Sequence, residues 1–225
     1  MRKILIFALL ISLSGTVFAQ RDGNYNYSIG VRAYNLFQLP KILDQTNSSD
    51  YTTSYLNGLM VKFNDNQIGI RISGNYYFKK DFSFRNECDN CEIATGDVDD
   101  FWAKIGFEKN FNYSAIQPYF AVDLGFRGMN FKGKINDVNN ASTSFNTITS
   151  KRGFIATPAL GLKINPVKQI SVFAECNMDF YFSYERQERT QNDAANTRTF
   201  AKFNKTETLI NPVSIGIQIH LVDKY

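Results

Sequence analysis

Hydrophobic and polar residues alternate one by one along most of the chain after its first two dozen positions. In one segment, Ile68, Ile70 and Ile72 alternate with Gly69 and Arg71. This period of two is typical of a β-strand, whose successive side chains point to opposite faces, whereas a helix repeats about every 3.6 residues. The alternation predicts eight strands, at Tyr25–Phe37, Tyr55–Phe63, Ile68–Phe78, Phe101–Phe111, Ile116–Phe131, Gly153–Ile164, Ile170–Tyr184 and Glu207–Leu221.

The connections between these strands alternate between short and long. The short ones, at 64–67, 112–115 and 165–169, have the composition of tight turns. In an up-and-down meander, every second connection lies at the same end, so all long loops share one end. Outer-membrane barrels have this asymmetry, with short turns in the periplasm and long loops outside the cell. The predicted long loops are polar and lie near 38–54, 79–100, 132–152 and 185–206.

The first 19 residues have the layout of an export signal. Arg2 and Lys3 precede an apolar run from Ile4 to Leu13, and small residues lead up to a cleavage point after Ala19. The run is too short to span a bilayer as a helix, so a retained N-terminal anchor is the weaker alternative. We expect residues 1–19 to be removed and residues 20–225 to form one barrel domain in the outer membrane of a diderm bacterium.

The alternation alone leaves open which face of the sheet is inside. A secreted lipocalin-like barrel would bury its apolar face, whereas an outer-membrane barrel would turn that face to lipid. Three features favour lipid: the polar face holds most strand glycines, the apolar face carries no central charge, and aromatic residues gather near strand ends. The lumen would then hold a set of charged side chains: Arg32, Lys62, Arg71, Lys104, Glu108, Asp123, Arg127, Lys163, Glu175 and Asp179.

The whole pattern resembles the small eight-stranded outer-membrane barrels, similar to the membrane domain of OmpA and to OmpX. The predicted last strand adds to the likeness. Its outward residues Ile215, Ile217, Ile219 and Leu221, with the terminal aromatic Tyr225, are similar to the assembly signal that such barrels carry. The resemblance implies insertion by the barrel-assembly machinery and contact with outer-membrane lipid.

Composition excludes several functional classes. The formal charge of +4, from 25 basic and 21 acidic residues, is too small to suggest binding to nucleic acid. One histidine, His220, nearly excludes His-based metal sites and leaves one possible His-dependent triad. Some barrels of this architecture modify lipids, but His220 is predicted in the lumen near the short-turn end. We therefore expect no catalytic, cofactor or metal site.

The three cysteines are too few for a disulfide scaffold. Cys88 and Cys91 lie close together in a predicted long loop, and an oxidising compartment favours a disulfide between them. Two free thiols, or a metal or redox role, are the alternatives. Cys176 is predicted on the outward face as an apolar filler.

The charged lumen residues have two interpretations: they could line an ion pathway, or they could form a paired network that plugs the barrel. Eight strands leave an interior just wide enough for side chains, which favours the plug. If Phe111 faces Ile116 across the short turn at 112–115, Lys104 faces Asp123. The sequence thus predicts a buried Lys104–Asp123 ion pair supported by Arg127.

The sequence as a whole predicts an all-β, eight-stranded, antiparallel, up-and-down transmembrane barrel. Its expected role is structural or in surface interaction, without enzymatic activity, as a monomer whose long loops bind any extracellular ligand. Three alternatives remain: a binder or conduit for small hydrophobic molecules, a lipid-modifying enzyme, and a secreted lipocalin-like binder.

Overall fold

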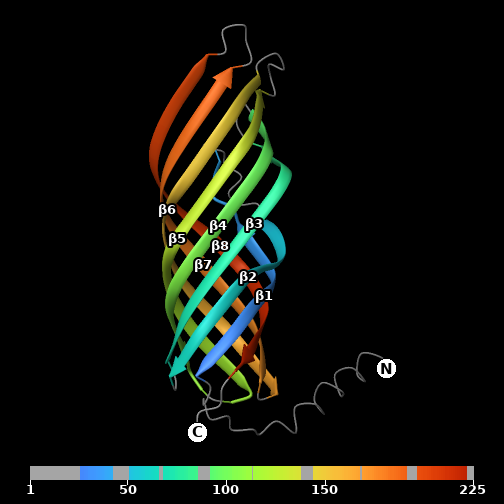
Figure 1. The fold of residues 1–225 in the computed structure, drawn as a ribbon, viewed down its shortest axis with the longest axis vertical. Helices are drawn as coiled ribbons and strands as arrows, with labels where there is room; N and C mark the ends of the chain where they lie inside the picture. The colour runs from blue at the N-terminus through green and yellow to red at the C-terminus, as the bar shows by residue number, and fades with distance from the viewer. Residues whose placement is uncertain are drawn as a thin grey trace, which may run out of the picture.

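Eight antiparallel strands close into one barrel in the computed structural model (Figure 1). The structure describes residues 26–42, 51–65, 68–85, 92–112, 114–137, 144–167, 169–191 and 197–221. Each strand pairs with its neighbours in sequence, and β1 closes the ring against β8. The predicted fold class is therefore confirmed. The strands are β1 Tyr27–Gln38, β2 Tyr51–Asp65, β3 Ile68–Arg85, β4 Glu92–Asn110, β5 Ile116–Asp137, β6 Ser144–Val167, β7 Ile170–Gln191 and β8 Arg198–His220.

Most of the segments predicted as long loops are strand. β6 and β8, for example, contain 24 and 23 residues, about twice what a tilted strand needs to cross a bilayer. The prediction of loops at 79–100, 132–152 and 185–206 was wrong over most of their length. In parts of these segments the inward positions are themselves polar, as at Thr147, Thr149 and Gln187, so the contrast in polarity between the two faces is lost there.

The barrel wall is complete in its lower part and interrupted in its upper part. β2 pairs with β3 only from Gly58 to Asp65, and β1 pairs with β8 only up to Leu36. Above these points β3 to β8 continue as a six-stranded sheet, while the chain after β1 turns inward (Figure 1). Leu56, with positive φ, lies where β2 leaves β3, and Asp81, also with positive φ, lies in the register shift of β3 against β4.

Candidate functional site

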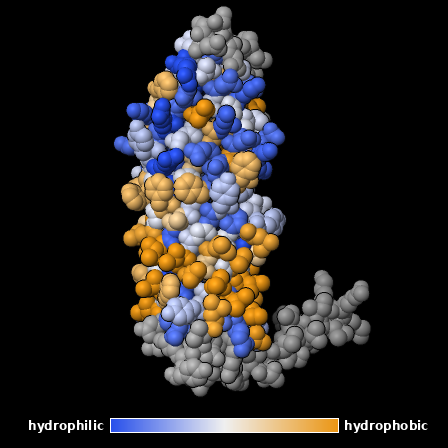
Figure 2. Space-filling view, viewed as in Figure 1, coloured by the Kyte–Doolittle hydropathy of each residue, from blue (hydrophilic) through white to orange (hydrophobic). Residues whose placement is uncertain are grey.

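The outer surface of the barrel divides into an apolar belt and a polar extension. On the face shown in Figure 2, hydrophobic residues cover the lower half of the wall and hydrophilic residues cover the upper half. The belt is made of exposed side chains such as Ile70, Leu124, Leu160 and Ile217, on strands all around the barrel. So large a continuous apolar surface is incompatible with water and matches the hydrocarbon core of a membrane.

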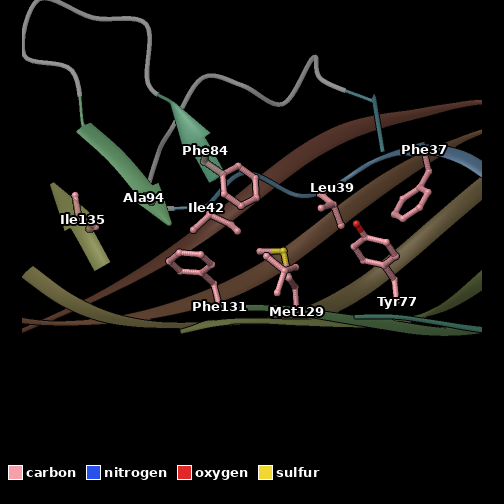
Figure 3. Close-up of a cluster of buried hydrophobic side chains, with 10 residues drawn as sticks. Phe37, Leu39, Ile42, Tyr77, Phe84, Ala94, Met129, Phe131 and Ile135 are labelled. Carbon is pink, nitrogen blue, oxygen red and sulfur yellow. The ribbon is translucent and has the colours of Figure 1, made fainter. Parts of the chain in front are cut away.

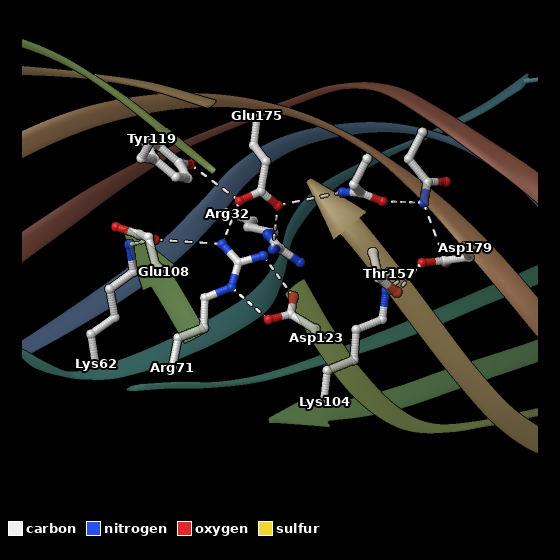
Figure 4. A network of polar contacts seen from close by, with 12 residues as sticks. Arg32, Lys62, Arg71, Lys104, Glu108, Tyr119, Asp123, Thr157, Glu175 and Asp179 are labelled. Carbon is white, nitrogen blue, oxygen red and sulfur yellow. Dashed lines mark hydrogen bonds and ion pairs between the residues drawn. The ribbon is translucent and has the colours of Figure 1, made fainter. Parts of the chain in front are cut away.

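Inside the belt, Arg71 on β3 is the centre of a buried ion-pair network (Figure 4). Its Nε and Nη2 donate to the two carboxylate oxygens of Asp123, at 2.7 and 2.6 Å. Its Nη1 donates to Glu175 at 2.6 Å and lies 3.5 Å from Glu108. One guanidinium thus joins carboxylates from β4, β5 and β7 across the lumen, which uses the planar fork that distinguishes arginine from lysine.

Glu108 on β4 bridges two lysines in the same layer. Its two oxygens lie 2.5 Å from the Nζ atoms of Lys62 and Lys163. Lys62 and Arg71 are directly opposed across the β2–β3 pair, where like charges repel. Glu108 contacts both of them, so the repulsion is compensated by a carboxylate that reaches over from the next strand.

A second cluster lies above the first and is built on Asp179 of β7. Lys104 donates to one Asp179 oxygen at 2.6 Å, as does Thr157, and Arg127 lies 3.3 Å from the other. Arg127 also makes a bidentate pair with Asp100, with both bonds at 2.9 Å. The predicted Lys104–Asp123 pair was therefore wrong: Lys104 faces Gly125 across the hairpin and reaches Asp179.

All ten charged residues singled out in the sequence lie in the barrel interior and are at most 5 % exposed. Asp100, fully buried, is a member that the sequence interpretation missed. It fell in a segment predicted as loop, although it shares the parity of Trp102 and Lys104 and could have been found by extending their strand upward.

Aromatic side chains fill the space between the charged groups. The Lys104 Nζ lies 4.5 Å from the centre of the Trp102 ring, and the Arg32 guanidinium lies 5.1 Å from it, so this ring links the two clusters. Two glycines make room for large neighbours: a Cβ at Gly161 would overlap Tyr119, and one at Gly216 would overlap Phe173. The cavity beside Trp102 measures about 10 Å³, which holds about one water molecule.

The upper lumen holds an apolar cluster (Figure 3). The chain after β1 enters the barrel there, so Leu39 and Ile42 are buried against side chains from β3, β4 and β5. Those neighbours include Tyr77, Met129 and Phe131. This part of the segment predicted as the loop 38–54 therefore lies inside the barrel.

A third polar cluster holds this inward segment in place. Lys151, fully buried, donates to the backbone oxygen of Lys41 at 2.7 Å and pairs with Glu207 and Glu185. The Lys41 backbone N–H donates to Glu207 at 2.9 Å. Lys151 and Glu185 lay in predicted loops, and the alternation of buried and exposed residues in β6 and β7 is the signal that would have found them.

Asp99 lies on the outer face of β4, just above the apolar belt. Partial burial raises the pKa of its carboxyl group, and the neighbouring carboxylate of Asp100 raises that pKa further. The acidic outward residue is therefore easier to protonate than an ordinary aspartate.

His220 lies at the short-turn end of the barrel, as predicted from the sequence. Its Nδ1 lies 2.9 Å from the hydroxyl of Ser28 and its Nε2 lies 2.7 Å from the hydroxyl of Ser171. Both serines have 0 % exposure, so neither hydroxyl is accessible to a substrate from solvent. The arrangement joins β1, β7 and β8 by hydrogen bonds where the barrel closes.

The predicted disulfide and export signal lie outside the described residues: Cys88, Cys91 and residues 1–19 are not among them. Cys176 is a free, exposed thiol on β7. Within the described ranges, no cluster of three or more histidine, cysteine or acidic side chains could hold a metal ion. No helix in the same ranges is long and apolar enough to cross a membrane.

Comparison with solved structures supports the fold. The chain is similar to a major outer membrane protein from Thermus thermophilus, with a TM-score of 0.53 and 9 % identity, over 87 % of this chain and 99 % of that one. The outer membrane protein OprG from Pseudomonas aeruginosa gives a TM-score of 0.47 and 12 % identity, over 88 % of this chain and 98 % of that one. No family model matches the sequence. No curated protein matches it either. The closed ring of eight strands and the likeness to the Thermus protein give the chain the architecture of an outer-membrane β-barrel.

Proposed function

We propose that the protein is a monomeric outer-membrane barrel of a diderm bacterium, non-conducting and without enzymatic activity, with a structural or surface-interaction role. Its architecture resembles that of the membrane domain of OmpA and of OmpX. The barrel-assembly machinery inserts it after export, and its polar extension binds any extracellular ligand. The observation that carries the proposal is the filled lumen, in which paired charges and aromatic rings occupy the membrane-spanning part.

The plug is supported by charge balance as well as by volume. In the clusters around Arg71 and Asp179, with Asp100 included, six cationic and five anionic groups lie inside the barrel, and each is paired with a group of opposite sign. An ion pathway needs exchangeable sites that bind an ion weakly and release it. Here the sites are occupied by the protein's own charges, and the apolar cluster around Ile42 covers them from above.

We expect no steady conductance when the purified barrel is inserted into a planar bilayer. The cavity beside Trp102 has room for about one water molecule and does not form a continuous column. A water-filled porin recorded in the same bilayer serves as the positive control. A large, stable open level from this protein would overturn the proposed plug.

The polar extension is proposed to face the outside of the cell. The end with the short connections, such as 66–67 and 168–169, would then lie in the periplasm, as in other barrels of this kind. The apolar belt leaves the extension of β3 to β8 in water, where it presents mainly polar side chains (Figure 2). It is this extended wall that would meet a partner.

Surface labelling tests this orientation. In a background with all three cysteines replaced by serine, we expect Lys134→Cys to react with a membrane-impermeant maleimide on intact cells. Lys134 is exposed on the outer face of β5, whereas Gln169 is exposed in a short turn. Gln169→Cys should react only after the outer membrane is permeabilised, and the reverse pattern would refute the orientation.

A binder of small hydrophobic molecules is the second candidate, favoured by the apolar cluster in the upper lumen. The site is occupied by the chain itself, because Leu39 and Ile42 fill it. This role would require the inward segment to leave the barrel and break the contacts of Lys41 with Lys151 and Glu207.

A further inference from the structure

A row of basic side chains lies on the outer wall directly above the apolar belt. Arg186 on β7 and Lys202 on β8 are directly opposed in the strand register and both are exposed. Arg152 on β6 is diagonal to Arg186, because its partners across the register are Gly128 and Tyr184. Three cationic groups from three neighbouring strands thus share one patch, here called the basic patch: Arg152, Arg186 and Lys202.

In the part of the chain that the structure describes, the basic patch contains a charge repulsion that no carboxylate compensates; the one aromatic contact is the Phe200 ring, whose centre lies 5.8 Å from the Arg186 guanidinium. Like charges directly opposed on one face of a sheet are destabilising. In the lumen, the opposed pair Lys62 and Arg71 is bridged by Glu108. Among the described residues, no carboxylate pairs with Arg152, Arg186 or Lys202; the nearest outward acid along β7, Glu188, is paired with Arg198. An external anion that contacts both Arg186 and Lys202 would compensate their repulsion, as Glu108 does for Lys62 and Arg71 in the lumen.

An aromatic row immediately below the basic patch marks the edge of the membrane. Phe126, Phe154 and Phe182 are register partners on β5, β6 and β7, and all three are exposed. Aromatic side chains of this kind gather at membrane–water interfaces. Arg186 is four residues beyond Phe182, roughly 13 Å along the strand, so the basic patch lies at the depth of lipid headgroups.

A groove runs from the phenylalanine row to Arg152, and Arg186 and Lys202 lie outside its lining. It has a volume of about 470 Å³ and is lined by Phe154, Phe182, Tyr184 and Arg152, together with Asn204 and Thr206 from β8. Its lining combines phenylalanine rings with the basic residues Arg152 and Lys205, which fits a molecule with a hydrocarbon chain and a charged head. A free anion would use only the upper part of the groove.

We propose that the basic patch and its groove bind the phosphate-bearing headgroup of an anionic lipid in the outer leaflet. Arg186 and Lys202 share one phosphate, Arg152 donates to the same group or to a second phosphate, and an acyl chain lies along the phenylalanine row. Arginine favours this chemistry because its planar fork matches phosphate oxygens. The inference rests on the membrane placement proposed above, whose own tests are conductance and surface labelling.

Lipid titration of the purified barrel, followed by native mass spectrometry in a non-ionic detergent, tests the proposal. The probes are diphosphoryl lipid A and, as the zwitterionic comparison, phosphatidylcholine. We expect one diphosphoryl lipid to bind and the double variant Arg186→Gln/Lys202→Gln to weaken its binding roughly 30-fold, which is about 2 kcal/mol for two interfacial charges. Phosphatidylcholine should bind the unmodified protein much more weakly than the diphosphoryl lipid.

The matched control is Lys79→Gln/Lys80→Gln, which removes the same charge from exposed positions on β3. The affinity of this variant for the diphosphoryl lipid should stay within about twofold of that of the unmodified protein. It loses the same net charge, and therefore only the general attraction to an anion. An equal loss in both double variants would overturn the proposal, as would unchanged affinity in Arg186→Gln/Lys202→Gln. Full displacement of the lipid by equimolar inorganic pyrophosphate would show a free-phosphate site instead and would also overturn it.

The substituted side chains are exposed, so all variants should fold. A gel band whose mobility differs between unboiled and boiled samples verifies this. Arg186→Gln/Lys202→Gln should also be no less stable than the unmodified protein in lipid-free detergent, because it removes an uncompensated repulsion. A marked loss of stability there would show that a carboxylate of the protein pairs with the two side chains, and the lipid proposal would fail.

Discussion

Replacing Arg71 by methionine is expected to destabilise the refolded barrel by about 3–5 kcal/mol. The substitution leaves Asp123 and Glu175 without the guanidinium that bonds to them at 2.6–2.7 Å, deep in the membrane-spanning lumen. Removing one partner of a buried pair is costly because the other charge remains uncompensated. Urea unfolding can be followed by the fluorescence of Trp102, the one tryptophan of the chain, which lies inside the lumen beside Arg32 and Lys104.

The matched control for Arg71→Met is Arg198→Met. The Arg198 side chain is 60 % exposed and pairs with Glu188 on the outer wall, so its loss should change stability by less than about 1 kcal/mol. Neutralising an orphaned carboxylate, as in Arg71→Met/Asp123→Asn, should recover part of the loss. Equal effects of the two arginine substitutions would contradict a network centred on Arg71.

For the ten charged residues of the predicted strands, the sequence was sufficient to predict that they face the lumen. Strand side chains alternate strictly between two faces, so one correctly assigned residue fixes the side of every other residue in an unbroken strand. The alternation placed Arg71 and Asp123 inside, and the structure places both there, at 1 % exposure. It also gave the closing order of eight strands, because consecutive strands of a meander pair with their neighbours.

The upper barrel could not be predicted in the same way. Beyond the membrane, both faces of a strand can be polar: the wall meets water outside, and inside Lys151 and Glu185 satisfy each other. Hydrogen bonds between strands hold such segments together without an apolar face, so hydropathy along the chain carries little signal. The inward course of the segment with Ile42 could not be predicted either, because its partners Met129 and Phe131 are far away in sequence.

The sequence could not predict which charged residues pair with each other across the lumen, and the β4–β5 hairpin explains why. The expected register placed Phe111 opposite Ile116, whereas the observed register places Asn110 opposite Tyr119. The slip amounts to two residues, which preserves the face of every side chain but changes every partner. Lys104 thus stays inside, faces Gly125, and extends across the lumen to Asp179 on β7.

A pair of double-mutant cycles distinguishes the observed partner of Lys104 from the one expected by hairpin counting. Lys104→Met alone should cost about 3–5 kcal/mol, since Asp179 loses the ammonium that bonds to it at 2.6 Å. Combined with Asp179→Asn, the two losses should fall short of additivity by about 1–3 kcal/mol, as expected for residues in one network. When Lys104→Met is combined with Asp123→Asn, the two losses of stability should be closer to additive, because Asp123 is held by Arg71.

The cycles are measured by urea unfolding under one detergent condition, with Lys104→Met/Lys134→Met as the reference for a distant, exposed lysine. Additivity for Lys104 with Asp179, together with strong coupling to Asp123, would restore the hairpin pair and require a register two residues away from the observed one. The stronger coupling to Asp179 is expected because Lys104 and Asp179 are in direct contact, whereas Lys104 and Asp123 are linked only through the surrounding charges. The same measurement therefore tests the register of the β4–β5 hairpin and the pairing that fills the lumen.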